Sequence, residues 1–354
     1  MALFNMNTNF DLNRLVRPNV AKLKPYSSAR DEFQSTGTEM VFLDANENPF
    51  QTDVNRYPDP QQRTLKAELA KIKGLAQENI LLGNGSDEVL DLIFRAFCEP
   101  KIDNVITLPP TYGMYAVLAN INDVENREIE LTPGFQPNIS NILKAVDEQS
   151  KIIFLCSPNN PTGNSFSEEG VIEILENFSG LVVIDEAYID FSKHPSWLKK
   201  LQTYPNLVIT QTLSKAYGMA GIRLGICYAS KEIISILNKI KPPYNVNELS
   251  QLRALKRISK MDEVKQEVAD ILQERTRLFK ALLEVSYIQK IYESDANFIL
   301  IKVDDATKRY YEMLEMGIVI RNRTTQPLCE NTLRLTVGTA DENDRLIEAL
   351  KTIN

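Results

Sequence analysis

Lys215 is the side chain of this sequence best placed to react with a ligand. It follows the apolar run LVITQTL at residues 207–213, in the segment TLSKA. A lysine just after a buried strand lies at the mouth of a sheet, where α/β proteins bind ligands. If it is partly withdrawn from water, it loses its proton more easily and can form a Schiff base with an aldehyde. Taken alone, the residue is better explained as a solvated lysine that opens a helix, because most lysines are exposed.

Asp185 is a carboxylate at the end of a second apolar run, LVVID at residues 181–185, and the segment DEAY continues from it to Tyr188. Burying a carboxylate costs free energy unless a cation or hydrogen-bond donors face it. A cationic group of a bound ligand would be such a partner, with Tyr188 positioned to hydrogen-bond the same ligand. An acidic helix start or a Mg²⁺ ligand explains the same pattern.

Two polar loops complete the candidate site. The segment GNGSDE at residues 83–88 leads into a helix, and glycines followed by the first N–H groups of a helix are suited to a phosphate. Ser214 and Arg223 would add a hydroxyl and a cation to that phosphate. The segment SPNNPTG at residues 157–163 follows another apolar run and would offer the Asn160 amide. Each loop alone is weak evidence, since any helix start resembles the first and a tight turn explains the second.

The elements that must position these residues follow an α/β pattern. Near-continuous apolar runs predict buried strands of a sheet that is covered on both faces. After Pro242-Pro243 the pattern changes to a long charged helical stretch, which predicts a domain boundary. Strands are expected at 105–108, 152–156, 181–185, 207–213, 298–303, 318–321 and 333–337, and helices at 62–73, 86–98, near 167–178, within 247–284, near 305–316 and from about 341.

Composition excludes several classes of function. The 354 residues carry a formal net charge of −7, so no global basic field attracts nucleic acid or an anionic membrane. No apolar run reaches the roughly 20 residues of a membrane span and no signal peptide is evident, which favours a cytoplasmic location. His194 is the one histidine, and Cys98, Cys156, Cys227 and Cys329 form no CxxC pair, so we expect no metal site and free thiols.

The order SPNNPTG, DEAY and SK, with Arg223 eight positions after Lys215, resembles the fold type I aminotransferases, which use pyridoxal 5′-phosphate (PLP). The match covers roughly residues 80–225. Over nearly the whole chain the sequence is similar to the histidinol-phosphate aminotransferases, on the segments PYSSAR, NENP, RYP, RAF, PTYGMY, DEAYI and LRLTVGT.

The resemblance implies an α/β fold of the type I PLP-dependent transferases. It implies a large domain with a mostly parallel seven-stranded sheet and a smaller α+β domain. The expected division is an N-terminal arm at 1–45 that packs on the small domain, the PLP-binding domain at 46–245 and the small domain at 246–354. It also implies a homodimer with shared active sites.

The same resemblance implies roles for matching residues. Lys215 would be the Schiff-base lysine and proton shuttle, and Asp185 would pair with the pyridine nitrogen, which makes the ring an electron sink. Tyr188 would take part in catalysis with Lys215 and Asp185. Together with Asn160, it would hold the 3′ oxygen of the cofactor. The remaining cofactor-binding residues would be Gly85, Ser86, Asp87, Tyr112, Ser214 and Arg223, with Tyr57 reaching the phosphate from the other subunit.

The implied substrates are glutamate/2-oxoglutarate and histidinol phosphate/imidazole-acetol phosphate, so one pocket must accept a carboxylate and a phosphate. Arginine suits both because its planar fork can bond either group. The substrate-binding residues would be Tyr26, Asn160, Arg321 and Arg334, and the part played by Arg323 stays open. Alternatives are an aromatic or general aminotransferase, a threonine-phosphate decarboxylase and a PLP-binding regulator, while the missing GxGxxG counts against a dehydrogenase.

Overall fold

The computed structural model describes residues 10–25 and 41–353. Within them the helices are α1 (Leu12–Leu15), α2 (Pro18–Lys22), α4 (Arg63–Lys73), α5 (Gly85–Phe97), α6 (Met114–Ile121), α7 (Ile139–Ala145), α8 (Glu168–Asn177), α9 (Lys231–Ile240), α10 (Glu248–Ile258), α11 (Met261–Leu282), α12 (Ala306–Glu315) and α13 (Ala340–Thr352). Short 3₁₀ turns lie at Gln77–Asn79, Ile189–Phe191, Trp197–Lys200 and Ala220–Ile222. None of these helices is long and apolar enough to cross a membrane.

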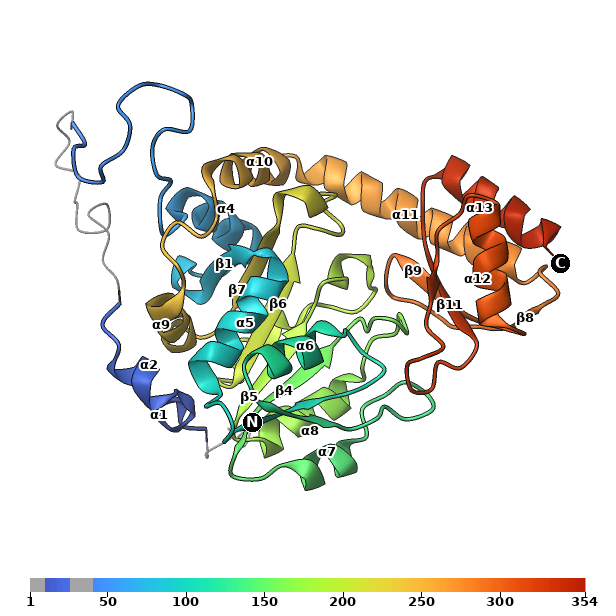
Figure 1. The fold of residues 1–354 in the computed structure, drawn as a ribbon, viewed down its shortest axis with the longest axis horizontal. Helices are drawn as coiled ribbons and strands as arrows, with labels where there is room; N and C mark the ends of the chain where they lie inside the picture. The colour runs from blue at the N-terminus through green and yellow to red at the C-terminus, as the bar shows by residue number, and fades with distance from the viewer. Residues whose placement is uncertain (1–9, 26–40, 354) are drawn as a thin grey trace, which may run out of the picture.

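A seven-stranded sheet forms the centre of the larger part of the molecule (Figure 1). Its strands are β1 (Ile80–Asn84), β2 (Asn104–Thr107), β3 (Glu125–Glu128), β4 (Ser150–Cys156), β5 (Leu181–Asp185), β6 (Leu207–Thr212) and β7 (Leu224–Tyr228), in the order β1-β7-β6-β5-β4-β2-β3. Only β7 is antiparallel to its neighbours. The seven-stranded, mostly parallel sheet expected from the sequence is therefore confirmed.

Both faces of this sheet are covered, as the apolar strand sequences predict. In β5, Val182 and Ile184 join one buried cluster while Leu181 and Val183 join another, because successive side chains of a strand point to opposite faces. Helices α4, α8 and α10 contribute to the first cluster, and α5, α6 and α9 to the second. The sheet is therefore a rigid central layer whose edges can hold side chains in fixed positions.

The smaller part contains a four-stranded antiparallel sheet in the order β10-β11-β9-β8. Its strands are β8 (Ile288–Ile291), β9 (Phe298–Val303), β10 (Arg321–Asn322) and β11 (Thr332–Thr336), and α11, α12 and α13 pack on it (Figure 1). The strand expected at 318–321 begins only at Arg321. The helical stretch at 247–284 is two helices, α10 and α11, which are separated at Ser259-Lys260.

Two features differ from the expected division of the chain. Helix α10 lies beyond the expected boundary at 246, yet its Ala254 and Ile258 pack in the core of the large sheet. Helices α1 and α2 belong to the expected arm, but Leu15 and Val20 pack with α5 and α9 rather than with the small sheet. The packing of the arm on the small domain is thus wrong for residues 12–22, because their apolar side chains complete the large core. Residues 1–9 and 26–40 of the arm lie outside the described residues.

Candidate active site

The carboxyl ends of β4, β5 and β6 meet at one edge of the large sheet. Cys156 pairs with Asp185 and Asp185 with Thr210, so these parallel strands end at the same level. A pocket opens at this edge, where ligands bind in α/β sheets. It is lined by Ser86, Asp87, Tyr112, Cys156, Asn160, Asp185, Ala187, Tyr188, Thr212, Ser214, Lys215 and Arg223. Most of the residues singled out in the sequence are therefore brought together.

Asp185 is buried at the floor of this pocket, with 3% of its surface exposed. Its carboxylate accepts hydrogen bonds from Tyr115 Oη at 3.0 Å and from the Ala187 N–H at 3.1 Å. Burial raises the pKa of Asp185, and these two hydrogen bonds oppose the rise. Across residues 10–25 and 41–353 no lysine or arginine forms an ion pair with it. A protonated ring nitrogen is the kind of ligand group that would stabilise this buried charge.

Lys215 lies at the surface of the same pocket. Its Nζ is 5.7 Å from the ring centroid of Tyr188. Although the side chain is open to solvent, partial desolvation by the surrounding protein lowers the pKa of Lys215, and the positive charges of Arg334 and Arg223 lower it further. The amine is therefore more readily available as a nucleophile or a base than an ordinary lysine.

Asn160 connects the pocket to the small sheet. Its Nδ2 donates to Tyr188 Oη at 3.5 Å, and its Oδ1 accepts a hydrogen bond from Arg334 Nη1. The Arg334 guanidinium also lies 5.1 Å from the centroid of the Phe298 ring. Burial first, and then the neighbouring Arg323, lower the pKa of Arg334 to about 10. Burial raises the pKa of Tyr188.

The N-terminus of α5 forms a second wall of the pocket, beside Ser214 and Arg223. Gly85 begins this helix with a φ of 76°, a conformation that favours glycine. Strand β7 lies directly behind the start of α5: a Cβ added to Gly225 would lie only 2.2 Å from Ser86 N. The free N–H groups of a helix start, a hydroxyl and a guanidinium together suit a phosphate.

Asp87 faces this wall from the first turn of α5. It accepts hydrogen bonds from Tyr112 Oη at 2.9 Å and from Arg223 Nη2 at 3.4 Å. Desolvation first, and then Asp87, raise the pKa of Tyr112. The structure thus places Asp87 where it orients the aromatic side chain and the cation.

Four of the expected residues that the structure describes do not line this pocket: Tyr57, Gly85, Arg321 and Arg334. Tyr57 is 49% exposed in a separate depression and stacks on Tyr244, with ring centroids 4.5 Å apart. Arg321 is exposed on β10, opposite Arg334. Tyr26 lies outside the described residues. The fold of one subunit therefore does not bring Tyr57 to this pocket.

Tyr115 is a site residue that the motifs did not identify. It is fully buried behind Asp185 and stacks on Phe154, with ring centroids 4.9 Å apart. Its segment PTYGMY contains two tyrosines, and periodicity within α6 could have shown that the second one points inward. Cys156 also lines the pocket, and its place at a strand end is a signal that sequence reasoning left unused.

A buried carboxylate, a reactive lysine and a helix N-terminus around one pocket fit PLP, whose ring nitrogen, aldehyde and phosphate match them in turn. In the part of the chain that the structure describes, no cluster of three His, Cys, Asp or Glu could hold a metal ion. This fold and this pocket therefore define a PLP-dependent enzyme of the fold type I class.

Comparison with known proteins gives the family. The model of the aminotransferase class I and II family matches residues 36–350, and the chain belongs to this family. It is 69% identical to a histidinol-phosphate aminotransferase from Flavobacterium johnsoniae, over 99% of this chain and 100% of that one. The cofactor is PLP, and the enzyme is a transaminase.

Solved structures agree with this assignment. The crystal structure of the histidinol-phosphate aminotransferase from Clostridium acetobutylicum matches with a TM-score of 0.79 at 25% identity, over 85% of this chain and 91% of that one. The enzyme of the same name from Sinorhizobium meliloti, solved in complex with PLP, matches with a TM-score of 0.78 at 24% identity, over 85% and 83% of the two chains. The second match supports the fold alone.

Proposed function

We propose that this chain transfers the amino group between glutamate/2-oxoglutarate and histidinol phosphate/imidazole-acetol phosphate, a step of L-histidine biosynthesis. The observation that carries the proposal is the position of Arg334, which reaches from the small sheet to Asn160 at the pocket. A guanidinium there can bind the carboxylate of one substrate and the phosphate of the other. The name of the Flavobacterium relative supports the same pair of substrates.

PLP bound in the pocket supplies an aldehyde that accepts the amino group and a ring that takes up electrons from the substrate. Lys215 holds the cofactor at rest, and its amine then removes and returns the proton at the substrate Cα. Desolvation, and then the positive charges of Arg334 and Arg223, lower the pKa of this amine, which favours its action as a base. Asp185 keeps the ring nitrogen protonated, and Tyr115 and Ala187 orient its carboxylate.

The other pocket residues fix the orientation of the cofactor. Tyr112 would hold the ring by stacking, and Asn160 and Tyr188 would hold the 3′ oxygen. The N–H groups at Ser86 and Asp87 would bind the phosphate together with Ser214 and Arg223, whereas the Gly85 N–H donates to Arg223 O at 2.9 Å, so Gly85 would contribute through its backbone conformation. Arg321 and Tyr26 bind the substrate phosphate with Arg334. In this scheme Asp87 acts through its carboxylate as well, by holding Tyr112 and Arg223 in place.

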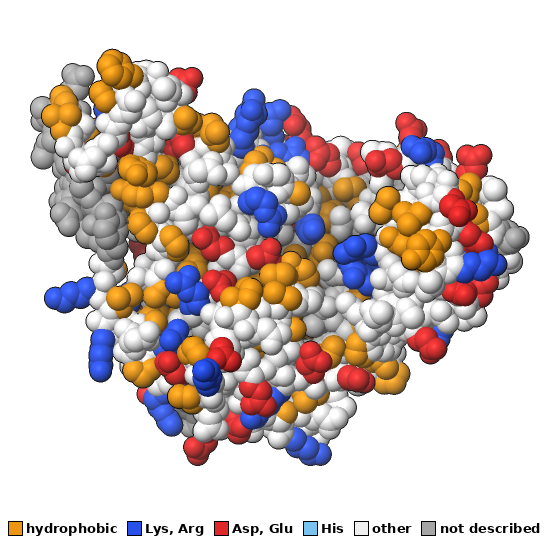
Figure 2. Space-filling view, viewed as in Figure 1, with side chains coloured by type: hydrophobic (Ala, Val, Ile, Leu, Met, Phe, Trp, Pro, Cys, Tyr) orange, Lys and Arg blue, Asp and Glu red, His pale blue; other side chains and the backbone are white. Residues whose placement is uncertain are grey.

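We also propose a cytoplasmic homodimer in which Tyr57 reaches the phosphate of the partner subunit. The segment that carries Tyr57 extends away from the body of the molecule at the upper left of Figure 1. Figure 2 shows hydrophobic side chains over this projecting region. Large exposed patches of this kind favour a protein interface. The exposed residues there and on the adjacent helix α10 are Val41, Leu43, Phe50, Val54, Tyr57, Leu249 and Leu252.

The visible absorption spectrum of the purified, PLP-loaded protein tests the proposed substrates. We expect the band of the lysine-bound cofactor to bleach on addition of histidinol phosphate and to return with 2-oxoglutarate. A Lys215→Ala variant should lack the band and serves as the control. A band that responds to other amino acids but not to histidinol phosphate would refute these substrates. Release of carbon dioxide in place of an oxo product would indicate the decarboxylase instead.

A further inference from the structure

The two faces of the small sheet have different surroundings. On β11, Leu333 and Leu335 pack into the core formed with α11, α12 and α13. On β9, Phe298 and Leu300 pack into the core of the large sheet instead. Arg334 pairs with Leu300, and side chains of paired residues share a face. The face that carries Arg334 is therefore the one that looks toward the large sheet and the pocket.

Arg321 and Arg323 belong to the same face. Arg321 is the ladder partner of Arg334, and the N–H of Arg323 donates to Thr332 O at 2.9 Å, which continues the pairing of β10 with β11. Side chains two residues apart on a strand point the same way. The positive charge of Arg323 acts on both Arg334 and Tyr188, which places it near the pocket. Figure 2 shows basic side chains along the boundary between the two parts of the molecule.

These three guanidiniums have no acidic partner. Within residues 10–25 and 41–353, none of them forms an ion pair with a carboxylate. The Nε atoms of Arg323 and Arg334 are buried and lack a hydrogen-bond acceptor. Burial first, and then Arg321, lower the pKa of Arg323. Three mutually repelling cations, two of them with a buried Nε and none with an ion-pair partner among the described residues, are unfavourable together unless an anion joins them.

The number of positive charges indicates which anion binds to these three arginines. A phosphate monoester carries about −1.5 to −2 charges at neutral pH and offers three acceptor oxygens. A carboxylate carries a single charge and two oxygens, which the fork of Arg334 alone can satisfy. A third arginine on the same face therefore exceeds what glutamate requires and matches what a phosphate monoester requires.

We propose that Arg323 is a specificity-determining residue that binds the substrate phosphate and is dispensable for the carboxylate of glutamate. This inference rests on the proposed function, because it assigns the two substrates of that reaction to different sets of arginines. Arg334 serves both substrates, whereas Arg323 contributes its charge and its free Nε only when the phosphate is present.

Single-turnover kinetics of the PLP-loaded enzyme, measured separately with histidinol phosphate and with glutamate, test the assignment. For Arg323→Gln we expect the efficiency with histidinol phosphate to fall about 10- to 100-fold, mainly through weaker binding, as for the loss of a charge-assisted hydrogen bond. The efficiency with glutamate should change less than about twofold, as expected for a group with no part in that step. Arg323→Lys should restore part of the loss.

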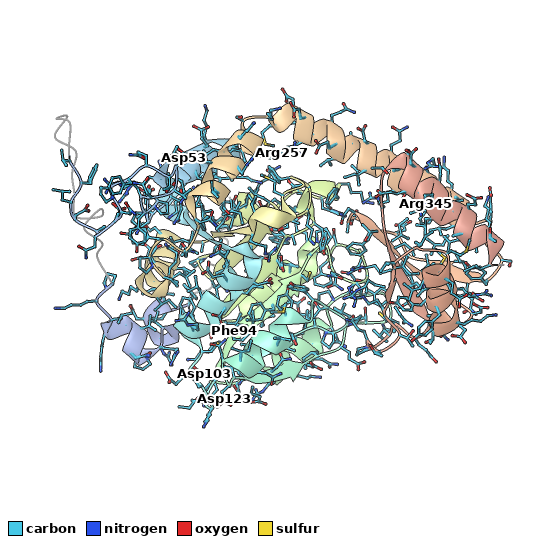
Figure 3. All side chains as sticks on the ribbon, turned by 45° about the horizontal axis from the view of Figure 1, so that its top comes forward. Asp53, Phe94, Asp103, Asp123, Arg257 and Arg345 are labelled. Carbon is cyan, nitrogen blue, oxygen red and sulfur yellow. The ribbon has the colours of Figure 1, made fainter. Side chains whose placement is uncertain are left out.

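Arg345→Gln is the matched control, since Arg345 is exposed on α13, and this helix packs on the face of the small sheet opposite to the one that carries Arg334 (Figure 3). It should leave both reactions unchanged. Equal losses with both substrates in Arg323→Gln would show a merely structural role, and no loss with either would also overturn the inference. Inorganic phosphate, tested as an inhibitor of the glutamate reaction, should act more weakly on Arg323→Gln than on the wild type. If the wild type ignores histidinol phosphate, the proposed function fails, and the phosphate comparison still decides the role of Arg323.

Discussion

Replacing Tyr115 with Phe would remove one hydroxyl from behind the cofactor pocket. That hydroxyl donates to Asp185 Oδ2 at 3.0 Å, while the ring stacks on Phe154. Phe keeps the ring contact, so we expect the variant to fold. The Asp185 carboxylate would retain the 3.1 Å hydrogen bond from the Ala187 N–H. The change therefore isolates one interaction of the buried carboxylate.

The expected magnitude follows from the chemistry of this hydrogen bond. A hydrogen bond to a charged group contributes about 1.5–3 kcal/mol. Since about 1.4 kcal/mol corresponds to a tenfold change in an equilibrium constant, the affinity of the free protein for PLP should fall about 10- to 100-fold near neutral pH. The ionised carboxylate stabilises the protonated ring nitrogen, so the loss appears in cofactor binding as well as in turnover.

The pH dependence of PLP affinity has a definite sign. The Tyr115 hydrogen bond lowers the pKa of Asp185, and burial raises it. Removing the hydroxyl therefore moves the pKa of Asp185 further upward. PLP affinity should decline as pH falls through this pKa, and in Tyr115→Phe the decline should begin at a higher pH. In the free protein, folded Asp185 keeps its proton to a higher pH than the unfolded chain does. Stability should therefore fall as pH rises from the ordinary carboxyl pKa through the folded one.

Titration of the free protein with PLP across this pH range, followed by absorbance or fluorescence, measures the effect. Tyr311→Phe is the control, because Tyr311 is 60% exposed on α12. An unchanged affinity together with an unchanged acid limb in Tyr115→Phe would refute the claim that this phenol governs the ionisation of Asp185.

Two further predictions concern the cofactor wall and the subunit contact. Gly225→Ala should lower the melting temperature by an amount that corresponds to about 1–3 kcal/mol and weaken PLP binding, because its Cβ would overlap Gly85 C and Ser86 N at 2.2 Å. Gly221→Ala is the control, since nothing lies within 4 Å of its added Cβ, and equal behaviour of the two variants in thermal unfolding would contradict the close approach. Tyr57→Ala and Lys215→Ala should each be impaired alone, yet mixed and reassociated subunits should regain activity, because one site of the hybrid contains both native residues. If mixing restores no activity, the active site is not shared between subunits.

Much of the large domain could be predicted because its strands are nearly continuous apolar runs that end in polar motifs. Asp185, Asn160 and Lys215 each follow such a run, and parallel strands bring those ends to one edge. The small-domain arginines were harder to place, because the strand at Arg321 covers only two residues and gains its meaning from its pairing with β11. Local pattern carries no such long-range information.

Other features depend on packing that no motif records. The short helices α1 and α2 contain few apolar residues, so their choice between the large and small cores could not be decided from the sequence. Helix α10 continues the charged stretch that was assigned to the small domain, but its Ala254, Leu255 and Ile258 pack against the large core. Tyr115 was missed for a similar reason, because its partner Asp185 lies 70 positions away.

The single reversed strand, β7, has a consequence for how this enzyme can diversify. Lys215 and Arg223 lie within one connection between β6 and β7, which is closed by the hydrogen bond from Leu213 N to Leu224 O at 3.1 Å. The spacing between the reactive amine and the cation beside the phosphate cradle is thus set inside one short hairpin. The arginines proposed to bind the substrates, by contrast, lie on the small sheet. Mutations in the small sheet can therefore alter which amino donors are used. The spacing of Lys215 and Arg223 in the β6–β7 connection, which positions the cofactor, stays unchanged.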